Sequence, residues 1–184
     1  MNQNTEEFQS ELESGLPRFD PHAFPRGIVA GEIPANKNIT KAARRWMADL
    51  ERDDIEFDHD AWLRYEEMLD DLIINDGHQL SGQKFDLLPW QAWCFGAAFW
   101  RRKECGSRRY KQIAIEVARG AGKTTAASTL LLFFAREIER STTWILANTV
   151  QQAQVAYQSA RTFAVDAWGD HNDKLIGDQA EWET

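Results

Sequence analysis

A short segment with two glycines carries the clearest chemical signal in this sequence. Residues 118–125 read ARGAGKTT, with an alternating apolar stretch before them and an apolar run of helical length after them. A strand, a glycine-rich turn and a helix, in that order, are the setting of a phosphate-binding loop. There, backbone N–H groups and the positive end of the helix hold phosphate oxygens. The sequence therefore predicts nucleotide binding at this segment.

The segment also offers side chains suited to Mg-ATP. Lys123 can neutralise the phosphates, and the hydroxyl of Thr124 can coordinate Mg²⁺. The general pattern G-x-x-x-x-G-K-[ST] would place a glycine at position 117, where this chain has Val117. The alternative is a glycine-containing turn followed by a core helix. The residues expected to contact the nucleotide phosphates are Gly120, Ala121, Gly122, Lys123, Thr124 and Thr125.

Two strands and two helices are expected to position this loop. Alternating apolar residues predict a strand over 112–118, and the apolar run predicts a helix over 124–139. A second buried strand is predicted over 142–147, which read TTWILA. Thr149 then has the form of a capping-box residue, and its helix is expected to end near Trp168. The predicted fold class is α/β: an incomplete P-loop NTPase core of the RecA-like (ASCE) type behind a mainly helical N-terminal region.

The N-terminal part differs in composition. Residues 1–15 are expected to form a solvated tail, and residues 16–34, with four prolines, an extended segment. Helices are predicted from Thr40, as an N-cap, to about Leu50, and again over 61–74. The acidic run 53–60 lacks calcium-loop spacing and is predicted to be a solvated turn, with a metal site as the alternative.

The chain is accordingly divided into a tail with a helical lead-in, residues 1–80, and the N-terminal portion of a P-loop ATPase domain, residues 81–184. Its 184 residues and 43 % hydrophobic content suffice for a packed core. Residues 1–80 hold 8 Lys and Arg against 18 Asp and Glu, whereas residues 81–184 hold 13 against 11. A global polyanion-binding surface is not indicated, but a local basic strip beside the phosphate loop is.

Location and redox state follow from two further observations. No stretch approaches the roughly 20 apolar residues that span a bilayer, and the acidic start lacks the features of a secretory signal. A cytoplasmic protein is expected. Cys94 and Cys105 are expected to be reduced and are assigned no metal or redox role.

The segment before the loop is rich in aromatic and basic residues. Pro89 suits an early helix position, and Trp93, Ala97 and Trp100 would share one helical face in the core. A glutamine amide such as that of Gln91 could read adenine through one acceptor and two donors. The basic run from 101 to 109 is predicted to be a turn, with simple solvation as its commoner fate.

Three elements together resemble one protein family. They are Leu87-Leu88-Pro89-Trp90-Gln91, the basic pair Arg108-Arg109, and the A-R-x-x-G-K-T loop over 118–124. The chain resembles the large subunit of tailed-phage DNA-packaging terminases over roughly residues 28–165. A loop without glycine at position 117 is typical of that group.

The resemblance implies roles that spacing alone does not supply. It implies that Gln91 belongs to the adenine-recognition element and that Arg119 senses or stabilises the γ-phosphate as a catalytic residue. It also implies a motor in the bacterial host cytoplasm that uses ATP and Mg²⁺ to move double-stranded DNA into a procapsid. The implied partners are a small terminase subunit and a portal; no membrane partner is implied.

The family pattern continues beyond what is found here. No apolar strand ending in Asp-Glu follows the loop, and no nuclease carboxylates are present. The sequence is therefore expected to be the N-terminal part of the ATPase domain, from an interrupted prophage gene or a fragment, and inactive alone. The alternatives are a small kinase, a helicase-like ATPase, or a non-catalytic module that associates with another protein or with itself.

Overall fold

The computed structural model of the chain describes residues 18–75 and 81–169. The predicted tail, His78 and the polar residues around Glu181 and Glu183 lie outside the described residues. No helix formed by residues 18–75 and 81–169 has the length and apolar composition needed to cross a bilayer.

The chain divides into two units, each built from two separate segments. The first comprises Met1–Glu66 and Leu87–Glu116, and the second comprises Glu67–Asp86 and Val117–Thr184. This division by contacts differs from the functional division at residues 80 and 81, which stays a prediction.

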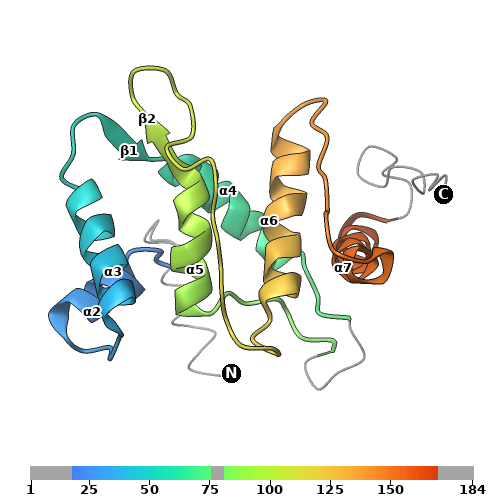
Figure 1. Ribbon diagram of the computed structural model, residues 1–184. Helices are drawn as coiled ribbons and strands as arrows, with labels where there is room; N and C mark the ends of the chain where they lie inside the picture. Colours follow the sequence, from blue (N-terminus) through green and yellow to red (C-terminus); the bar gives the residue numbers. More distant parts are fainter. Residues whose placement is uncertain (1–17, 76–80, 170–184) are drawn as a thin grey trace, which may run out of the picture. The chain divides into compact units, whose positions relative to one another are not determined.

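The first unit combines short helices with a two-stranded antiparallel sheet (Figure 1). Its elements are α2 (Ala23–Ala30), α3 (Lys37–Asp49), β1 (Ile55–Phe57), the first turns of α4 (His59–Asp70), α5 (Pro89–Gly96), the 3₁₀ turn η1 (Ala97–Phe99) and β2 (Trp100–Arg102). The second unit contains the end of α4 together with α6 (Lys123–Glu137) and α7 (Val150–Trp168).

The start of α3 corrects the prediction from sequence. The N-cap is Asn36, whose Oδ1 accepts hydrogen bonds from the backbone N–H groups of Asn38 and Ile39 at 2.9 and 3.0 Å. Thr40 lies inside the helix, where its hydroxyl donates to the Asn36 carbonyl at 3.0 Å. An asparagine that satisfies two orphan N–H groups starts the helix earlier than the threonine predicted for this role.

The proline-containing stretch is also not wholly extended. α2 forms within it and ends at Gly31, which has φ 81°. Pro25 occupies an early position in this helix, where its missing N–H has no intrahelical partner to lose. The prediction of an extended segment was therefore wrong for residues 23–30.

The acidic run contains a strand in place of the predicted solvated turn. Ile55 and Phe57 are buried on one side of β1, whereas Glu56 between them is exposed. β1 pairs antiparallel with β2, with Ile55 opposite Arg102 and Phe57 opposite Trp100. The turn prediction gave too little weight to the alternation of apolar and charged residues at 55–57, which is typical of a half-buried strand.

Aromatic side chains form the core of the first unit. Trp62 and Trp100 are each 1 % exposed, and the ring of Trp100 lies 5.4 Å from that of Trp46. α5 ends at Gly96, so Trp100 reaches the core from β2 and not from a continued helix as predicted. A Cβ at Gly96 would approach Pro21 Cβ to 2.9 Å, and glycine therefore permits this close packing.

The second unit is organised around α6 and α7, which pack against one another (Figure 1). Thr149 caps α7 by accepting from the Gln152 N–H at 3.3 Å, and both helices lie close to their predicted bounds. The ring of Phe163 packs 5.6 Å from that of Phe85, and Asn75 Nδ2 donates to Asp166 at 3.1 Å. These contacts join α7 to the segment that follows α4.

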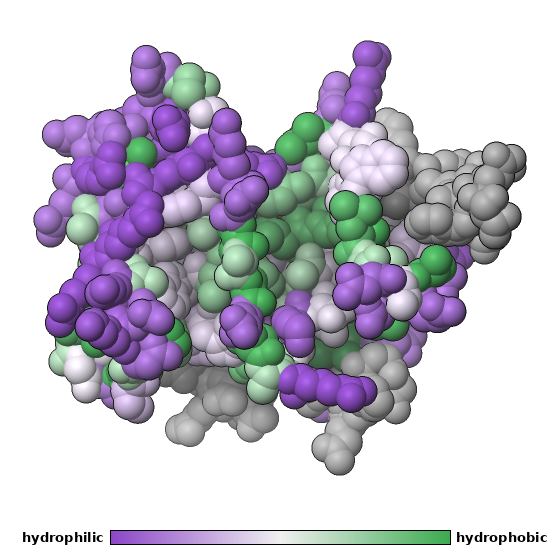
Figure 2. Space-filling view, viewed as in Figure 1, coloured by the Kyte–Doolittle hydropathy of each residue, from purple (hydrophilic) through white to green (hydrophobic). Residues whose placement is uncertain are grey.

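Neither of the two strands predicted beside the loop is present. Residues 112–118 and 142–147 carry no strand, and neither segment has ladder hydrogen bonds to another described segment. Trp144 is 77 % exposed and Leu146 is 88 % exposed. Figure 2 shows apolar atoms at the surface in this part of the second unit. The strand predictions were wrong for the described chain because an apolar segment becomes a strand only with a paired neighbour.

The basic run is only partly a solvated turn. Residues 103–105 do form a turn, but Arg109 has a side chain only 10 % exposed. Its Nη2 lies 2.7 Å from the carboxylate of Asp49, which is itself buried. Solvation was the wrong prediction for Arg109, because its partner is supplied by an element distant in sequence.

Two buried titratable groups respond to pH in opposite directions. Burial lowers the pKa of His22 to about 4, and its Nδ1 accepts from Trp46 Nε1 at 2.9 Å. Burial raises the pKa of Glu66 to about 7, although Phe19 N and Trp62 Nε1 both donate to this carboxylate. The contribution of His22 to the free energy of unfolding therefore decreases as pH falls from 6.5 toward 4. That of Glu66 decreases as pH rises from 4.5 toward 7.

The substitution Glu66→Gln tests the pH dependence assigned to Glu66. The folded state binds a proton on Glu66 more readily than the unfolded state, so the wild-type free energy of unfolding carries a falling contribution between pH 4.5 and 7. Glutamine cannot titrate, so the free energy of unfolding of the variant should rise relative to that of wild type by roughly 1 to 2 kcal/mol across that pH range. Urea unfolding at several pH values measures this. The exposed neighbour Glu67, changed to Gln, is the control. Parallel pH profiles for Glu66→Gln and wild type would contradict the assignment.

Candidate nucleotide-binding site

The glycines of the loop have the backbone conformation that a tight phosphate-binding turn requires. Gly120 has φ 84° and Gly122 has φ 70°, both in the left-handed region that favours glycine. A Cβ at Gly120 would meet nothing within 4 Å, so its backbone angle and not crowding accounts for the glycine. The turn is closed by a hydrogen bond of 3.4 Å from the Ala121 N–H to the Ala118 carbonyl.

The helix that follows presents its N-terminus without a side-chain cap. Gly122 is the N-cap of α6 and supplies no side-chain hydrogen bond, and the first backbone bond runs from Ala126 N to Gly122 O at 3.0 Å. The N–H groups of the first turn of an α-helix have no intrahelical acceptor. Together with the helix dipole, they favour an anion at this end.

The charged side chains of the loop are available. Lys123 and Arg119 are exposed, and neither forms an ion pair with any residue in 18–75 or 81–169. Ala121, Thr124 and Thr125 are half-buried, whereas Gly120 and Gly122 are exposed. The arrangement brings two positive charges and an uncapped helix end into one seven-residue stretch.

Ser128 fixes the start of α6, a role that the sequence analysis missed. Its Oγ lies 2.9 Å from the carbonyl oxygen of Thr124 and 3.2 Å from that of Ala156 in α7. Ser128 is 2 % exposed, so the hydroxyl belongs to the helix–helix contact. A serine one turn after the GKT element was the available signal, but only the position of α7 gives it a partner.

Thr124 is the residue of the loop that is predicted to contact Mg²⁺. Thr124 offers one hydroxyl ligand, and Mg²⁺ commonly combines one or two protein ligands with phosphate oxygens and waters. Among residues 18–75 and 81–169 no group of three His, Cys, Asp or Glu side chains is placed to hold a metal by itself. Thr124 is accordingly the protein ligand to which the sequence points.

Gln91 belongs to the first unit and has a structural role there. Its Oε1 accepts a hydrogen bond of 2.9 Å from the backbone N–H of Leu88, the N-cap residue of α5. The residue is only 4 % exposed. The adenine contact stays a prediction, and the structure adds that this amide stabilises the beginning of α5.

Comparison with known proteins supplies no relative for this site. The chain matches none of the family models, none of the curated proteins and none of the solved structures with which it was compared. The roles of Gln91 and Arg119 therefore stay predictions that rest on the sequence motifs.

The substitution Gln91→Met tests the structural role of this side chain. Methionine fills a similar volume but provides no strong acceptor for the Leu88 N–H, so the free energy of unfolding should fall by about 1 to 2 kcal/mol. Urea unfolding followed by circular dichroism measures the change. Gln154 is exposed on α7, and Gln154→Met should stay within about 0.5 kcal/mol of wild type. Equal effects of the two substitutions would remove the capping role.

Proposed function

We propose that this chain is the ATP-binding part of a DNA-packaging motor of the type formed by terminase large subunits. The observation that carries the proposal is the loop over 118–125, in which two left-handed glycines lead into a helix without a side-chain cap, beside the exposed Lys123. The order of the upstream P-W-Q element and this loop supports the terminase family over other P-loop proteins. The predicted α/β P-loop core is part of this proposal.

Each loop residue has a role in the proposal. The backbone N–H groups from 120 to 125, at the N-terminus of α6, bind the phosphates, and Lys123 offsets their charge. The hydroxyl of Thr124 contacts Mg²⁺, which when bound with ATP neutralises the β- and γ-phosphates. Arg119 is exposed at the beginning of the turn, where its guanidinium can stabilise charge on the transferred phosphoryl group.

The wider function is proposed from the same resemblance. Double-stranded DNA, a small terminase subunit and a portal are the proposed partners, in the cytoplasm of a bacterial host. Completion of ATP hydrolysis requires carboxylates that support Mg²⁺ and orient the attacking water. We expect nucleotide binding by this chain without efficient turnover.

Isothermal titration calorimetry with Mg-ATP tests the nucleotide site. Wild type should bind, and Lys123→Ala should bind at least about tenfold more weakly, because a hydrogen bond to a charged group contributes on the order of 1.5 to 3 kcal/mol. Lys111→Ala removes the same charge from an exposed residue outside the loop and should change little. Identical heats for Lys123→Ala and wild type would exclude the proposed site.

Assays of product distinguish the alternative enzymes. Transfer of phosphate from ATP to a nucleoside or nucleotide acceptor would favour a small kinase, and nucleic-acid unwinding would favour a helicase-like ATPase. Binding without either activity agrees with the proposal. A steady-state ATPase rate like that of complete motors would contradict the expected lack of turnover.

A second candidate function is association with another protein chain or with a second copy. The specific observation is the exposure of Trp144 and Leu146 in a segment that has no ladder hydrogen bonds with residues 18–75 or 81–169. A segment with unpaired backbone groups and exposed apolar side chains is a template for strand addition. Self-association would bury both side chains and pair the segment.

Paired substitutions test this association. The double variant Trp144→Ser with Leu146→Ser should shift sedimentation velocity profiles toward the monomer, because burial of two large apolar side chains no longer favours assembly. Val155 is 62 % exposed on α7 and lies outside the segment, so Val155→Ser is the control. A wild-type protein that remains monomeric at all accessible concentrations would count against self-association.

A further inference from the structure

A cavity rich in arginine lies within the first unit, separate from the loop. Its volume is about 400 Å³, and it opens between the end of α3, β1 and the segment around β2. Figure 2 shows mostly hydrophilic atoms on the visible face of these elements. The lining residues are Arg45, Arg52, Asp54, Ile55, Arg102, Glu104, Arg109 and Tyr110.

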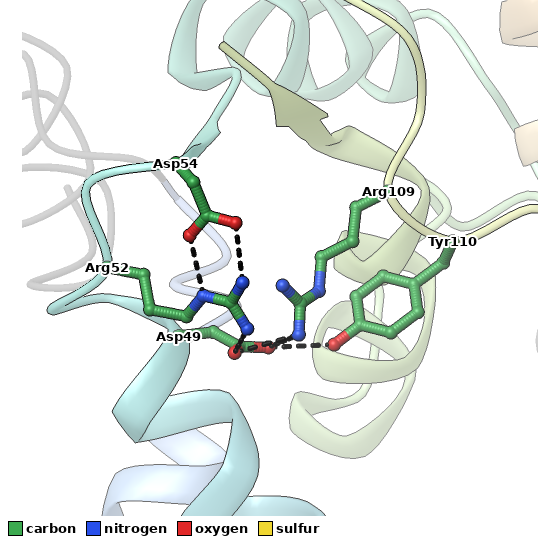
Figure 3. A network of polar contacts seen from close by, with 5 residues as sticks. All are labelled: Asp49, Arg52, Asp54, Arg109 and Tyr110. Atoms are coloured by element: carbon green, nitrogen blue, oxygen red, sulfur yellow. Dashed lines mark hydrogen bonds and ion pairs between the residues drawn. The ribbon is translucent and has the colours of Figure 1, made fainter. Parts of the chain in front are cut away.

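A buried carboxylate holds the cavity wall in place. Figure 3 shows the guanidinium groups of Arg52 and Arg109 on either side of Asp49. Asp49 accepts hydrogen bonds from Arg109 Nη2 at 2.8 Å and from the hydroxyl of Tyr110 at 2.9 Å. Arg52 is held in turn by Asp54, with 2.8 Å between Nε and Oδ1. Arg109 and Tyr110 are therefore held by a buried acceptor, whereas Arg52 and Asp54 form an exposed pair.

Arg109 has more donors than the protein uses. Its Nη2 is bound to Asp49, but its Nε is buried and has no acceptor among the described residues. In Figure 3 a second terminal nitrogen of Arg109 lies on the side of Arg52. A buried donor left without an acceptor costs about 1 to 3 kcal/mol, so a ligand that supplies oxygen acceptors here is favoured.

The charges around the cavity leave an excess of guanidinium groups. Arg45 and Arg102 form no ion pair with any residue in 18–75 or 81–169. Asp54 is engaged by Arg52, and Asp49 by Arg109. Of the acidic residues that line the cavity, Glu104 alone lacks an ion pair within the described chain. Within the described chain, the cavity is thus lined by two arginines without an ion pair and by one such carboxylate, and Arg45 lies over the ring of Tyr110 at 5.7 Å from its centroid.

We propose that this cavity binds a phosphate group, as the free ion or as the monoester of a small molecule. Planar guanidinium groups match the oxygens of phosphate in bidentate geometry, and that of Arg109 is held here by the buried Asp49. The volume lies within the range of small-ligand pockets. The site shares no residue with the loop over 118–125, so an experiment can contradict either site without bearing on the other.

Nuclear magnetic resonance of the full chain, labelled with ¹⁵N, tests the proposal. Inorganic phosphate is titrated at constant ionic strength while the side-chain Nε–H signal of Arg109 is followed. Saturable movement of this signal is expected. Arg45→Gln and Arg102→Gln should each weaken the apparent affinity at least about fivefold, on the scale of one lost charge-assisted hydrogen bond. Arg44→Gln removes the same charge from an exposed position of α3 that does not line the cavity, and should match wild type.

Further arms identify the source of the phosphate. Ribose 5-phosphate should move the same signal, and tighter binding than inorganic phosphate would identify a monoester, whereas equal binding would identify the free ion. An unmoved Arg109 signal would overturn the proposal, as would equal weakening by Arg44→Gln. A response to an oligonucleotide phosphodiester but not to phosphate would also overturn it. Arg45→Gln and Arg102→Gln change exposed side chains, so a loss of binding with an unchanged circular dichroism spectrum is not a loss of fold.

Discussion

The buried ion pair between Asp49 and Arg109 is the interaction on which the first unit most depends. It joins residues 60 positions apart, the end of α3 and the segment after β2, with both side chains at most 10 % exposed. Removal of one partner of a buried pair leaves an uncompensated charge and typically costs about 3 to 5 kcal/mol. The hydroxyl of Tyr110 adds a second donor to the same carboxylate. This shared acceptor holds the elements that form the arginine-rich cavity.

The second unit obeys a different constraint, which is the supply of backbone hydrogen bonds. α6 and α7 pair the backbone groups of their interior within each helix, whereas residues 142–147 have no ladder to join within the described chain. Backbone groups without protein partners must be exposed to water, and Trp144 and Leu146 are carried to the surface with them. The loop over 118–125 is consequently held by a pair of helices, with Ser128 at their contact, and not by a sheet.

The two candidate anion sites use different chemistry. The loop would bind phosphate through backbone N–H groups and a helix end, a design that needs glycine conformations and little side-chain order. The cavity would bind it through guanidinium groups, of which those of Arg109 and Arg52 are hydrogen-bonded to Asp49 and Asp54. The first kind of site can be recognised in a linear motif. The second has none, because its arginines come from α3, β2 and the segments that follow each of them.

The sequence by itself determined what local interactions decide. The bounds of α6 and α7, the N-cap Thr149 and the position of Pro89 at the start of α5 are set by neighbours within one helical turn. The tight turn at the glycines of the loop could likewise be predicted, because their φ angles are a property of the turn itself. Only the tertiary structure decided the burial of Arg109, the role of Asp49 and the failure of two apolar segments to become strands. Each of these depends on a partner distant in sequence, since an ion pair needs its opposite charge and a strand needs a neighbouring backbone.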